Sequence, residues 1–284
     1  MFVLGDGNPL VHIRAPYVNR SIIAACAAIF IAQAAGSVPI VDYGFVPAGV
    51  TGVPAEQVAW NDIKNTPMRL VSHQFMHANS PHLLGNMLML WVFGDNIEDA
   101  VGHIRYALFY LLCGVIAALT FGVIVADPWV PLVGASGSIS GVMGAYLLLH
   151  PRARVLVAAF SKVPLVLPGG LVVGFYLVLN LVMAFGGATS AGDLQVAWWA
   201  HIGGFVAGMV LILFMRQSDV ALFQPLSAYP VDPFPRLRTF AGKFGLGGLF
   251  AGGHKDSPDN DWLAAGLRAV GFVVIGLLLL GMIA

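Results

Sequence analysis

Four polar side chains stand out inside the long apolar runs of this sequence, where such groups are uncommon. They are Ser136, His201, His82 and Asn86. A serine hydroxyl becomes an effective nucleophile when an adjacent histidine takes its proton. Imidazole and amide N–H groups can stabilise the oxyanion that forms when such a nucleophile attacks a carbonyl group. Polar groups within apolar segments mark functional sites by default, and this set is typical of acyl transfer.

The composition indicates which solvent surrounds these residues. Of the 284 residues, 58% are hydrophobic and only 10% are charged, whereas about 25% of the residues in a soluble domain are charged. The mean hydropathy is +0.83, so we expect a lipid bilayer to surround much of the protein surface. The formal net charge is zero, which argues against a nucleic-acid partner. We interpret Cys26 and Cys113, each inside an apolar run, as small core residues.

The apolar runs that position the four side chains are long enough to be membrane helices, since a helix needs about 20 residues to cross a bilayer. Six runs are well defined: 20–41, 81–97, 104–126, 132–149, 165–186 and 196–215. A further run, 263–284, predicts an additional C-terminal transmembrane helix. The predicted fold class is therefore an all-α polytopic membrane protein. Its expected parts are an N-terminal segment (1–19), a six-span domain (20–215), a Pro- and Gly-rich linker (216–262) and the seventh helix.

The lysine and arginine residues predict the orientation of the chain. With the N-terminus in the cytoplasm, the cytoplasmic segments hold eleven or twelve of these residues, and the outside segments hold only Lys64 and Arg69. Positive charge concentrates on the cytoplasmic side of membrane proteins. We therefore expect a multi-pass protein with a cytoplasmic N-terminus and linker, in a bacterial plasma membrane.

Counting along the helices places the polar residues at one depth. Ser136 precedes the charged end of its span at Arg152 by 16 residues, and His201 precedes Arg216 by 15. At 1.5 Å per residue, both lie about 23 Å above that end. His82 lies about 20 Å above the end of its own span by the same arithmetic. Three separate helices thus bring a serine and two histidines into one layer.

Other polar residues complete this picture. Asn86 follows His82 by four residues and so shares its helix face. Ser136 begins its helix, where free backbone N–H groups favour an anion. Because no acidic residue lies at this depth, we expect a Ser–His dyad and no triad. We interpret Asn180, in the fifth span, as a hydrogen bond between helices.

Glycines at close helical spacing predict that the serine and histidine helices touch. Small residues at such positions let helix backbones approach each other. They lie along the fourth span at Gly134, Gly137, Gly141 and Gly144, and along the sixth at Gly204 and Gly208.

Four motifs in order resemble the rhomboid family of intramembrane serine proteases. Residues 134–137 resemble its G-x-S-G nucleophile motif, and residues 200–208 resemble its A-H-x-x-G-x-x-x-G helix. His73, His77, His82 and Asn86 match its H-x-x-x-H-x-x-x-x-H-x-x-x-N pattern, and residues 94–98 resemble the turn that closes its second span. The resemblance covers about residues 68–215 and implies a six-helix bundle with the serine helix at its centre.

The resemblance also implies roles for the motif residues. Ser136 is the implied nucleophile and His201 the general base, while His82, Asn86 and the Ser136 N–H are the implied oxyanion donors. His73 and His77 are the implied structural donors of the first loop, with support from Gly134, Gly137, Gly204 and Gly208. The implied activity is that of a serine endopeptidase that cleaves single-span membrane proteins, with no cofactor and no metal.

The sequence departs from the family pattern at two positions. Met68 stands where the first loop often has tryptophan, and Ser140 stands where many members place an aromatic residue under the histidine ring. We therefore expect His201 to be held mainly by packing through Gly204 and Gly208, and Ser140→Tyr to be tolerated.

The sequence disfavours three other interpretations of these residues. A catalytically inactive rhomboid-like protein could bind membrane clients, but the chain keeps both Ser136 and His201. A transporter or channel is disfavoured because the spans lack a mid-helix acidic or basic residue and the sequence lacks repeat symmetry. A metal site at the three histidines of the first loop and second span is disfavoured because no HExxH motif accompanies them.

Overall fold

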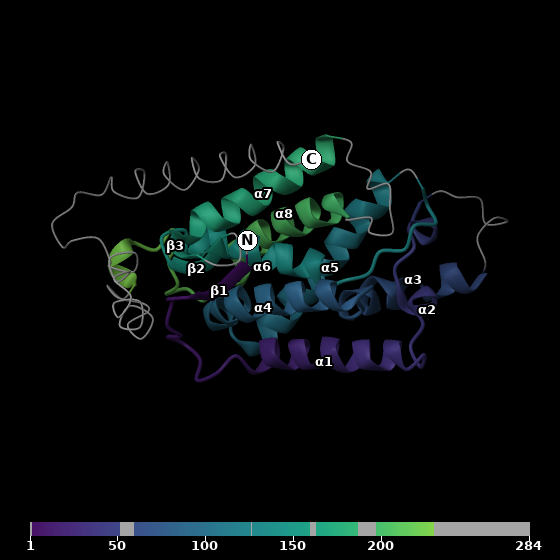
Figure 1. The fold of residues 1–284 in the computed structure, drawn as a ribbon, viewed down its shortest axis with the longest axis horizontal. Coiled ribbons are helices and arrows are strands. Elements are labelled where there is room, and N and C mark those ends of the chain that lie inside the picture. Colours follow the sequence, from purple (N-terminus) through teal and green to yellow (C-terminus); the bar gives the residue numbers. More distant parts are fainter. Residues whose placement is uncertain (1, 52–59, 126, 160–162, 187–196, 230–284) are drawn as a thin grey trace. The chain divides into compact units, whose positions relative to one another are not determined.

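The computed structural model describes residues 2–51, 60–125, 127–159, 163–186 and 197–229 of the chain (Figure 1). The chain divides into two compact units. The smaller unit comprises residues 1–9, 150–172 and 223–284, and the larger comprises 10–149 and 173–222. The predicted seventh helix, 263–284, and most of the predicted linker, 216–262, lie outside the described residues.

The larger unit is helical, and the predicted fold class of a polytopic helical membrane bundle is confirmed. The described ranges contain six long helices, which belong to this unit except for the first residues of α7. They are α1 (Tyr17–Ala34), α4 (Ser80–Val101), α5 (His103–Ile124), α6 (Ser136–Leu149), α7 (Gly169–Phe185) and α8 (Trp198–Met215). Short elements of the first loop join α1 to α4: α2 (Ile40–Tyr43), η1 (Pro47–Gly49), α3 (Trp60–Ser72) and η3 (His73–Phe75). By length and composition, α1, α5 and α8 could each cross a membrane, while α6 and α7 are shorter apolar helices.

Three of the differences between the predicted spans and the observed helices have a local cause. The first helix ends at Ala34, because Gly36 takes a positive φ and the chain turns away before α2. The fourth begins at Ser136, because the chain before it is extended and pairs with Phe45 through Leu132. The fifth begins at Gly169, since the residues before it form a strand.

The small unit contains a β-sheet that the sequence analysis did not anticipate. Strands β1 (Phe2–Asp6), β2 (Arg154–Ala159) and β3 (Val163–Pro168) form an antiparallel sheet in the order β1-β2-β3. Val155 and Val157 of the central strand are fully buried, and β-branched residues favour strands. A helical turn, η4 (Leu226–Ala228), also belongs to this unit.

α6 lies at the centre of the larger unit and is packed closely against α8 (Figure 1). A Cβ atom added at Gly204 would overlap the carbonyl oxygen of Gly137, and one added at Gly208 would overlap that of Gly141. The two helix backbones are therefore in direct contact, as the glycine spacing predicted. This contact fixes the height of α6 against α8, and so of Ser136 against His201.

Carboxylates at the end of α4 hold the start of α1. Glu98 accepts hydrogen bonds from the backbone N–H groups of Val18, at 3.0 Å, and Asn19, at 2.7 Å. These are first-turn amides of α1, which have no partner inside their own helix. The adjacent Asp99 accepts from the backbone N–H groups of residues 11, 12 and 13.

Candidate active site

Ser136 and His201 are in hydrogen-bond contact. Ser136 is the first residue of α6, and its Oγ lies 2.8 Å from Nε2 of His201 on α8. The His201 side chain is largely buried, with 9% of the residue exposed. The geometry is that of a serine hydroxyl donating to an imidazole nitrogen that can take its proton.

The chain enters α6 through a glycine with an uncommon conformation. Gly134 has a φ of +126°, which side chains with a Cβ rarely adopt. Its N–H donates to the carbonyl oxygen of His73 at 2.9 Å, which ties the entry of α6 to the first loop. A Cβ at Gly134 would lie 2.7 Å from Cε1 and 2.9 Å from Nε2 of His82. The His82 ring therefore lies beside the backbone that leads into Ser136.

α4 supplies His82 and Asn86. The helix starts with Asn79, whose side chain accepts from the His82 backbone N–H at 2.9 Å in an N-cap. Asn86 is 8% exposed, and its Nδ2 has no hydrogen-bond partner among the described residues. An unpaired buried donor is costly, so a donor left free beside His82 on the same helix face is available to a bound oxygen atom.

The two first-loop histidines differ: the His73 ring donates a hydrogen bond, whereas both buried ring nitrogens of His77 lack a hydrogen-bond partner among the described residues. His73 Nδ1 donates to the carbonyl oxygen of Arg69 at 2.9 Å. Burial lowers the pKa of His73 to about 4, which keeps the ring neutral near pH 7. The backbone of His77 exchanges two hydrogen bonds with the Gln33 side chain of α1, at 3.1 and 3.2 Å, and its ring packs edge-on against His82. Gln33 was missed by the sequence analysis, since a lone glutamine at a helix end carries no motif.

Gln74 is a second support that sequence reasoning did not identify. Its Oε1 accepts from Ser138 Oγ on α6 at 3.0 Å, and its Nε2 donates to the carbonyl oxygens of Leu70 and Leu111. One fully buried amide thus links the first loop, α5 and α6. Its position directly after the motif residue His73 was the one sequence feature that could have indicated this supporting role.

His201 also contacts Asn180 on α7. Nδ1 of His201 lies 2.8 Å from Oδ1 of Asn180, and Asn180 Nδ2 donates to the carbonyl oxygen of Tyr176 at 2.7 Å. The prediction that Asn180 forms a hydrogen bond between helices is confirmed. The identity of its partner, His201, could not be predicted from the sequence.

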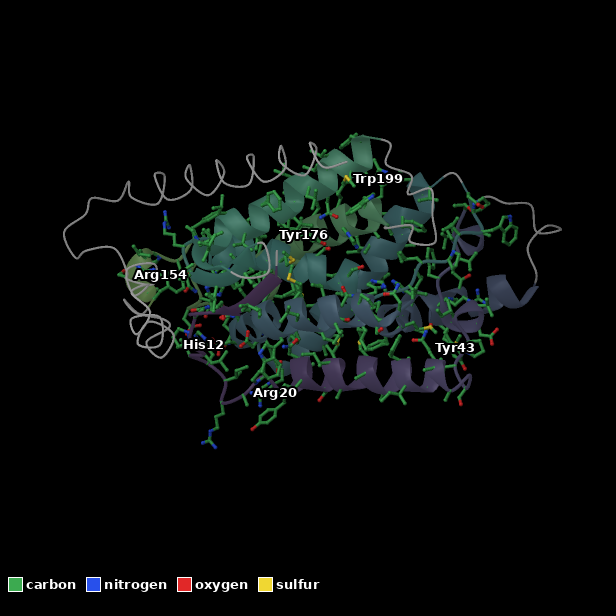
Figure 2. The ribbon with its side chains drawn as sticks, in the orientation of Figure 1. His12, Arg20, Tyr43, Arg154, Tyr176 and Trp199 are labelled. Carbon is green, nitrogen blue, oxygen red and sulfur yellow. The ribbon has the colours of Figure 1, made fainter. Side chains whose placement is uncertain are left out.

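Packing through Gly204 and Gly208 was expected to be the main support of His201, but its ring also has side-chain neighbours on α7. The rings of Tyr176 (labelled in Figure 2) and His201 have centroids 6.2 Å apart, and their planes are tilted by 33°. Ser140 donates back to the carbonyl oxygen of Ser136 at 2.7 Å and contacts the Tyr176 hydroxyl at 2.6 Å. One aromatic neighbour of His201 therefore comes from α7, and its hydroxyl contacts Ser140 of α6.

The sequence-derived site residues are thus distributed as follows. Ser136 and His201 meet directly, His82 adjoins Gly134, and Asn86 lies on the same helix as His82. The supporting residues Gly137, Gly204 and Gly208 lie in the contact between α6 and α8, and His73 and His77 lie in the first loop. Across the ranges that the structure describes, no group of three or more histidine, cysteine or acidic side chains could hold a metal ion.

Comparison with known proteins places these residues within one family domain. The model of the rhomboid domain matches residues 64–218, more than half of the chain. The chain belongs to the rhomboid family. Among its relatives, Rhomboid-related protein 2 of Mus musculus is 31% identical over 59% of this chain and 52% of its own. Rhomboid protein 1, mitochondrial, of Saccharomyces cerevisiae is 30% identical over 52% of this chain and 42% of its own.

A bacterial relative is also similar. The protein named "Putative rhomboid protease YdcA" of Bacillus subtilis is 35% identical over 53% of this chain and 68% of its own. The chain spans about half the length of the first two relatives, which are longer proteins. This rhomboid chain is an integral membrane protein, and its relatives come from mitochondria as well as from bacteria.

Proposed function

We propose that this rhomboid protein is an intramembrane serine endopeptidase that uses Ser136 and His201 as a catalytic dyad. The observation that carries the proposal is the 2.8 Å contact between Ser136 Oγ and His201 Nε2 at the start of a buried helix. Membership of the rhomboid family supports an intramembrane protease-like activity, and the name of the Bacillus subtilis relative agrees with it.

The first half of the proposed reaction forms an acyl-enzyme. His201 Nε2 takes the Ser136 proton while Oγ attacks the carbonyl carbon of the scissile peptide bond. The carbonyl oxygen becomes an oxyanion in the tetrahedral intermediate. His201 then returns the proton to the leaving amine, and the bond between carbon and nitrogen breaks.

The second half restores the enzyme. A water molecule loses a proton to His201 and attacks the ester carbonyl, which gives a second tetrahedral intermediate. Its collapse breaks the bond between carbon and Ser136 Oγ, and Oγ takes the proton back. The products are a free carboxylate and the regenerated hydroxyl, so no metal or redox cofactor enters the balance.

Three groups could stabilise the oxyanion. The Ser136 backbone N–H belongs to the first turn of α6, where amides lack partners within the helix and the helix dipole favours negative charge. His82 lies beside Gly134, and Asn86 keeps an unpaired Nδ2. One such donor is worth about 10²–10³ in kcat.

The proposed substrates are single-span membrane proteins, as the resemblance of the motifs to the rhomboid family implies. The proposed location is the plasma membrane of a bacterium. The distribution of lysine and arginine predicts that the N-terminus lies in the cytoplasm.

The test is cleavage of a panel of single-span substrates by the purified protein in liposomes, beside Ser136→Ala. Wild-type protein is expected to cleave at least one substrate and to be labelled by a serine-directed fluorophosphonate, while Ser136→Ala does neither. Cleavage by a folded Ser136→Ala variant would overturn the proposal. Wild-type protein that takes no label and cleaves nothing would instead favour the inactive client-binding alternative.

A further inference from the structure

We propose that Asn180 on α7 is a positioning residue for the general base: it holds the His201 ring with the proton on Nδ1, so that Nε2 is free to take the proton of Ser136. This inference rests on the proposed function of the Ser136–His201 pair and extends it to a third side chain on a third helix. It starts from the two hydrogen bonds of one buried amide.

The orientation of that amide is fixed by its second partner. One end of the Asn180 side chain lies 2.7 Å from the carbonyl oxygen of Tyr176. A carbonyl oxygen only accepts hydrogen bonds, so the end that faces it must be the NH₂ group. The oxygen Oδ1 therefore points to His201, and turning the amide over would place two acceptors against each other.

The orientation of the amide fixes the tautomer of the imidazole. Oδ1 of Asn180 only accepts, so Nδ1 of His201, 2.8 Å away, must carry the hydrogen atom. A neutral imidazole has one N–H, and Nε2 is then an acceptor. Nε2 is the atom that contacts Ser136 Oγ. The chain of contacts from the Tyr176 carbonyl through Asn180 and His201 to Ser136 thus selects the form of the base that can react.

A neutral amide suits the surroundings of this pair. Asn180 is 2% exposed and lies on a membrane helix. A carboxylate in this place would have to be buried as an uncompensated charge whenever His201 is neutral, which is expensive. An amide accepts the same hydrogen bond without that charge. The absence of an acidic residue at this depth, noted in the sequence, is therefore compatible with an oriented base.

Aromatic rings limit the remaining movement of His201. Tyr176 lies one turn before Asn180 on α7 and flanks the ring at 6.2 Å, and Trp198 meets it edge-on at 6.1 Å. Ser140 fixes the Tyr176 hydroxyl. The two α7 residues thus serve the ring in different ways: Tyr176 limits its tilt, and Asn180 decides which nitrogen carries the proton.

The first experiment compares three variants in liposomes, with kcat and KM measured on one cleaved substrate. Asn180→Leu keeps the size of the side chain but removes the acceptor, whereas Asn180→Asp keeps an oxygen that can accept from Nδ1. Val178→Leu, a lipid-exposed position on the same helix, is the matched control. A misdirected tautomer in a serine–histidine site costs up to about 10⁴ in kcat.

The expected order is wild type, then Asn180→Asp, then Asn180→Leu, with kcat for the leucine variant lowered about 10²-fold or more and KM unchanged. The control is expected to match the wild type. A merely structural role predicts the reverse order for the two variants, because leucine suits an apolar interior better than aspartate. A cleavage rate for Asn180→Leu equal to or above that of Asn180→Asp would overturn the proposal. If the leucine variant does not fold, Asn180→Ala replaces it in the comparison.

The second experiment reads the tautomer without any reaction. Protein with ¹⁵N-labelled histidine is studied in liposomes by solid-state NMR at a pH where the ring is neutral, and the His201 signals are assigned by their loss in His201→Gln. We expect the proton on Nδ1 in wild type and a mixture of tautomers in Asn180→Leu. A wild-type ring protonated on Nε2 would overturn the inference. If Ser136→Ala still cleaved substrate, the proposed function would fail, whatever the tautomer.

Discussion

Gly134 and the imidazole of His82 occupy adjoining space: a methyl group on Gly134 would lie 2.7 Å from Cε1 of the ring. The glycine also has a φ of +126°, which alanine rarely adopts. The two constraints are independent, and both act on the residue that sets the entry of the chain into α6. The glycine is thus required by the backbone and by the neighbouring ring.

Gly134→Ala is therefore expected to lower kcat by about 10²-fold, the effect of losing one oxyanion donor, because His82 must move and the Ser136 N–H must turn. The matched control is Gly174→Ala, since an added Cβ there meets nothing within 4 Å. The measurement is the cleavage rate of both variants, with thermal unfolding as the check on folding. A folded Gly134→Ala with the wild-type rate would contradict the assignment of this entry segment to the site.

Ser136→Ala and His201→Ala are each expected to abolish cleavage, and the double variant is expected to be no worse than either. The two side chains act as one unit across their 2.8 Å contact, so their losses do not add. Initial rates for the three variants on one substrate check this. Partly active single variants with additive losses would exclude the dyad.

His82→Ala and Asn86→Ala are each expected to lower kcat by about 10²–10³ while fluorophosphonate labelling of Ser136 continues. The physical reason is that either change removes a donor and leaves the nucleophile and base in place. Labelling rate and turnover are measured on the same preparation. Unchanged turnover in both variants would contradict the oxyanion role and show that the two side chains serve only in packing.

The helices and the principal site residues were predictable because their signals are local. Long apolar runs indicate spans, and helix rise alone placed Ser136 and His201 at one height, where the structure brings them into contact. Glycine spacing indicated which helices touch, since only a side chain of one hydrogen lets two backbones meet as Gly141 and Gly208 do.

What could not be predicted depends on contacts between distant segments. The sequence predicts that Asn180 forms an interhelical hydrogen bond, but its partner depends on the rotation of α7 against α8, which the sequence does not give. The sheet was missed because β1 and β2 are about 150 residues apart and pair only in three dimensions. The capping of α1 by Glu98 is likewise a contact between segments 79 and 80 residues apart.

Ser140→Tyr tests how the aromatic neighbour of His201 is placed. The sequence comparison alone led us to expect tolerance, but Ser140 is fully buried and its hydroxyl already touches that of Tyr176. A second ring has no room there, so we expect a loss of about 1–3 kcal/mol in stability from overpacking. Ser140→Ala is the control, with a loss of about 1 kcal/mol for the hydrogen bonds and cleavage nearly retained. An unfolding temperature for Ser140→Tyr equal to wild type would contradict this.

His12, labelled in Figure 2, makes the stability of the larger unit depend on pH. Its Nδ1 lies 3.1 Å from Asp99 and its Nε2 lies 3.2 Å from Asp219. Burial alone would lower the pKa of His12, but hydrogen bonds and charge contacts with the two carboxylates outweigh it and raise the pKa above its ordinary value. In the unfolded chain that value is about 6.5. The charged ring therefore stabilises the fold fully below about pH 6.5, and this contribution disappears as the pH rises through the raised pKa.

His12→Gln is expected to unfold at a lower temperature than wild type at about pH 6, with the difference shrinking toward about pH 8.5. Thermal unfolding in detergent across this range measures it, and Asp219→Asn should remove part of the same dependence. A difference between wild type and His12→Gln that stays constant with pH would show that the ring acts only as a neutral hydrogen-bonding group.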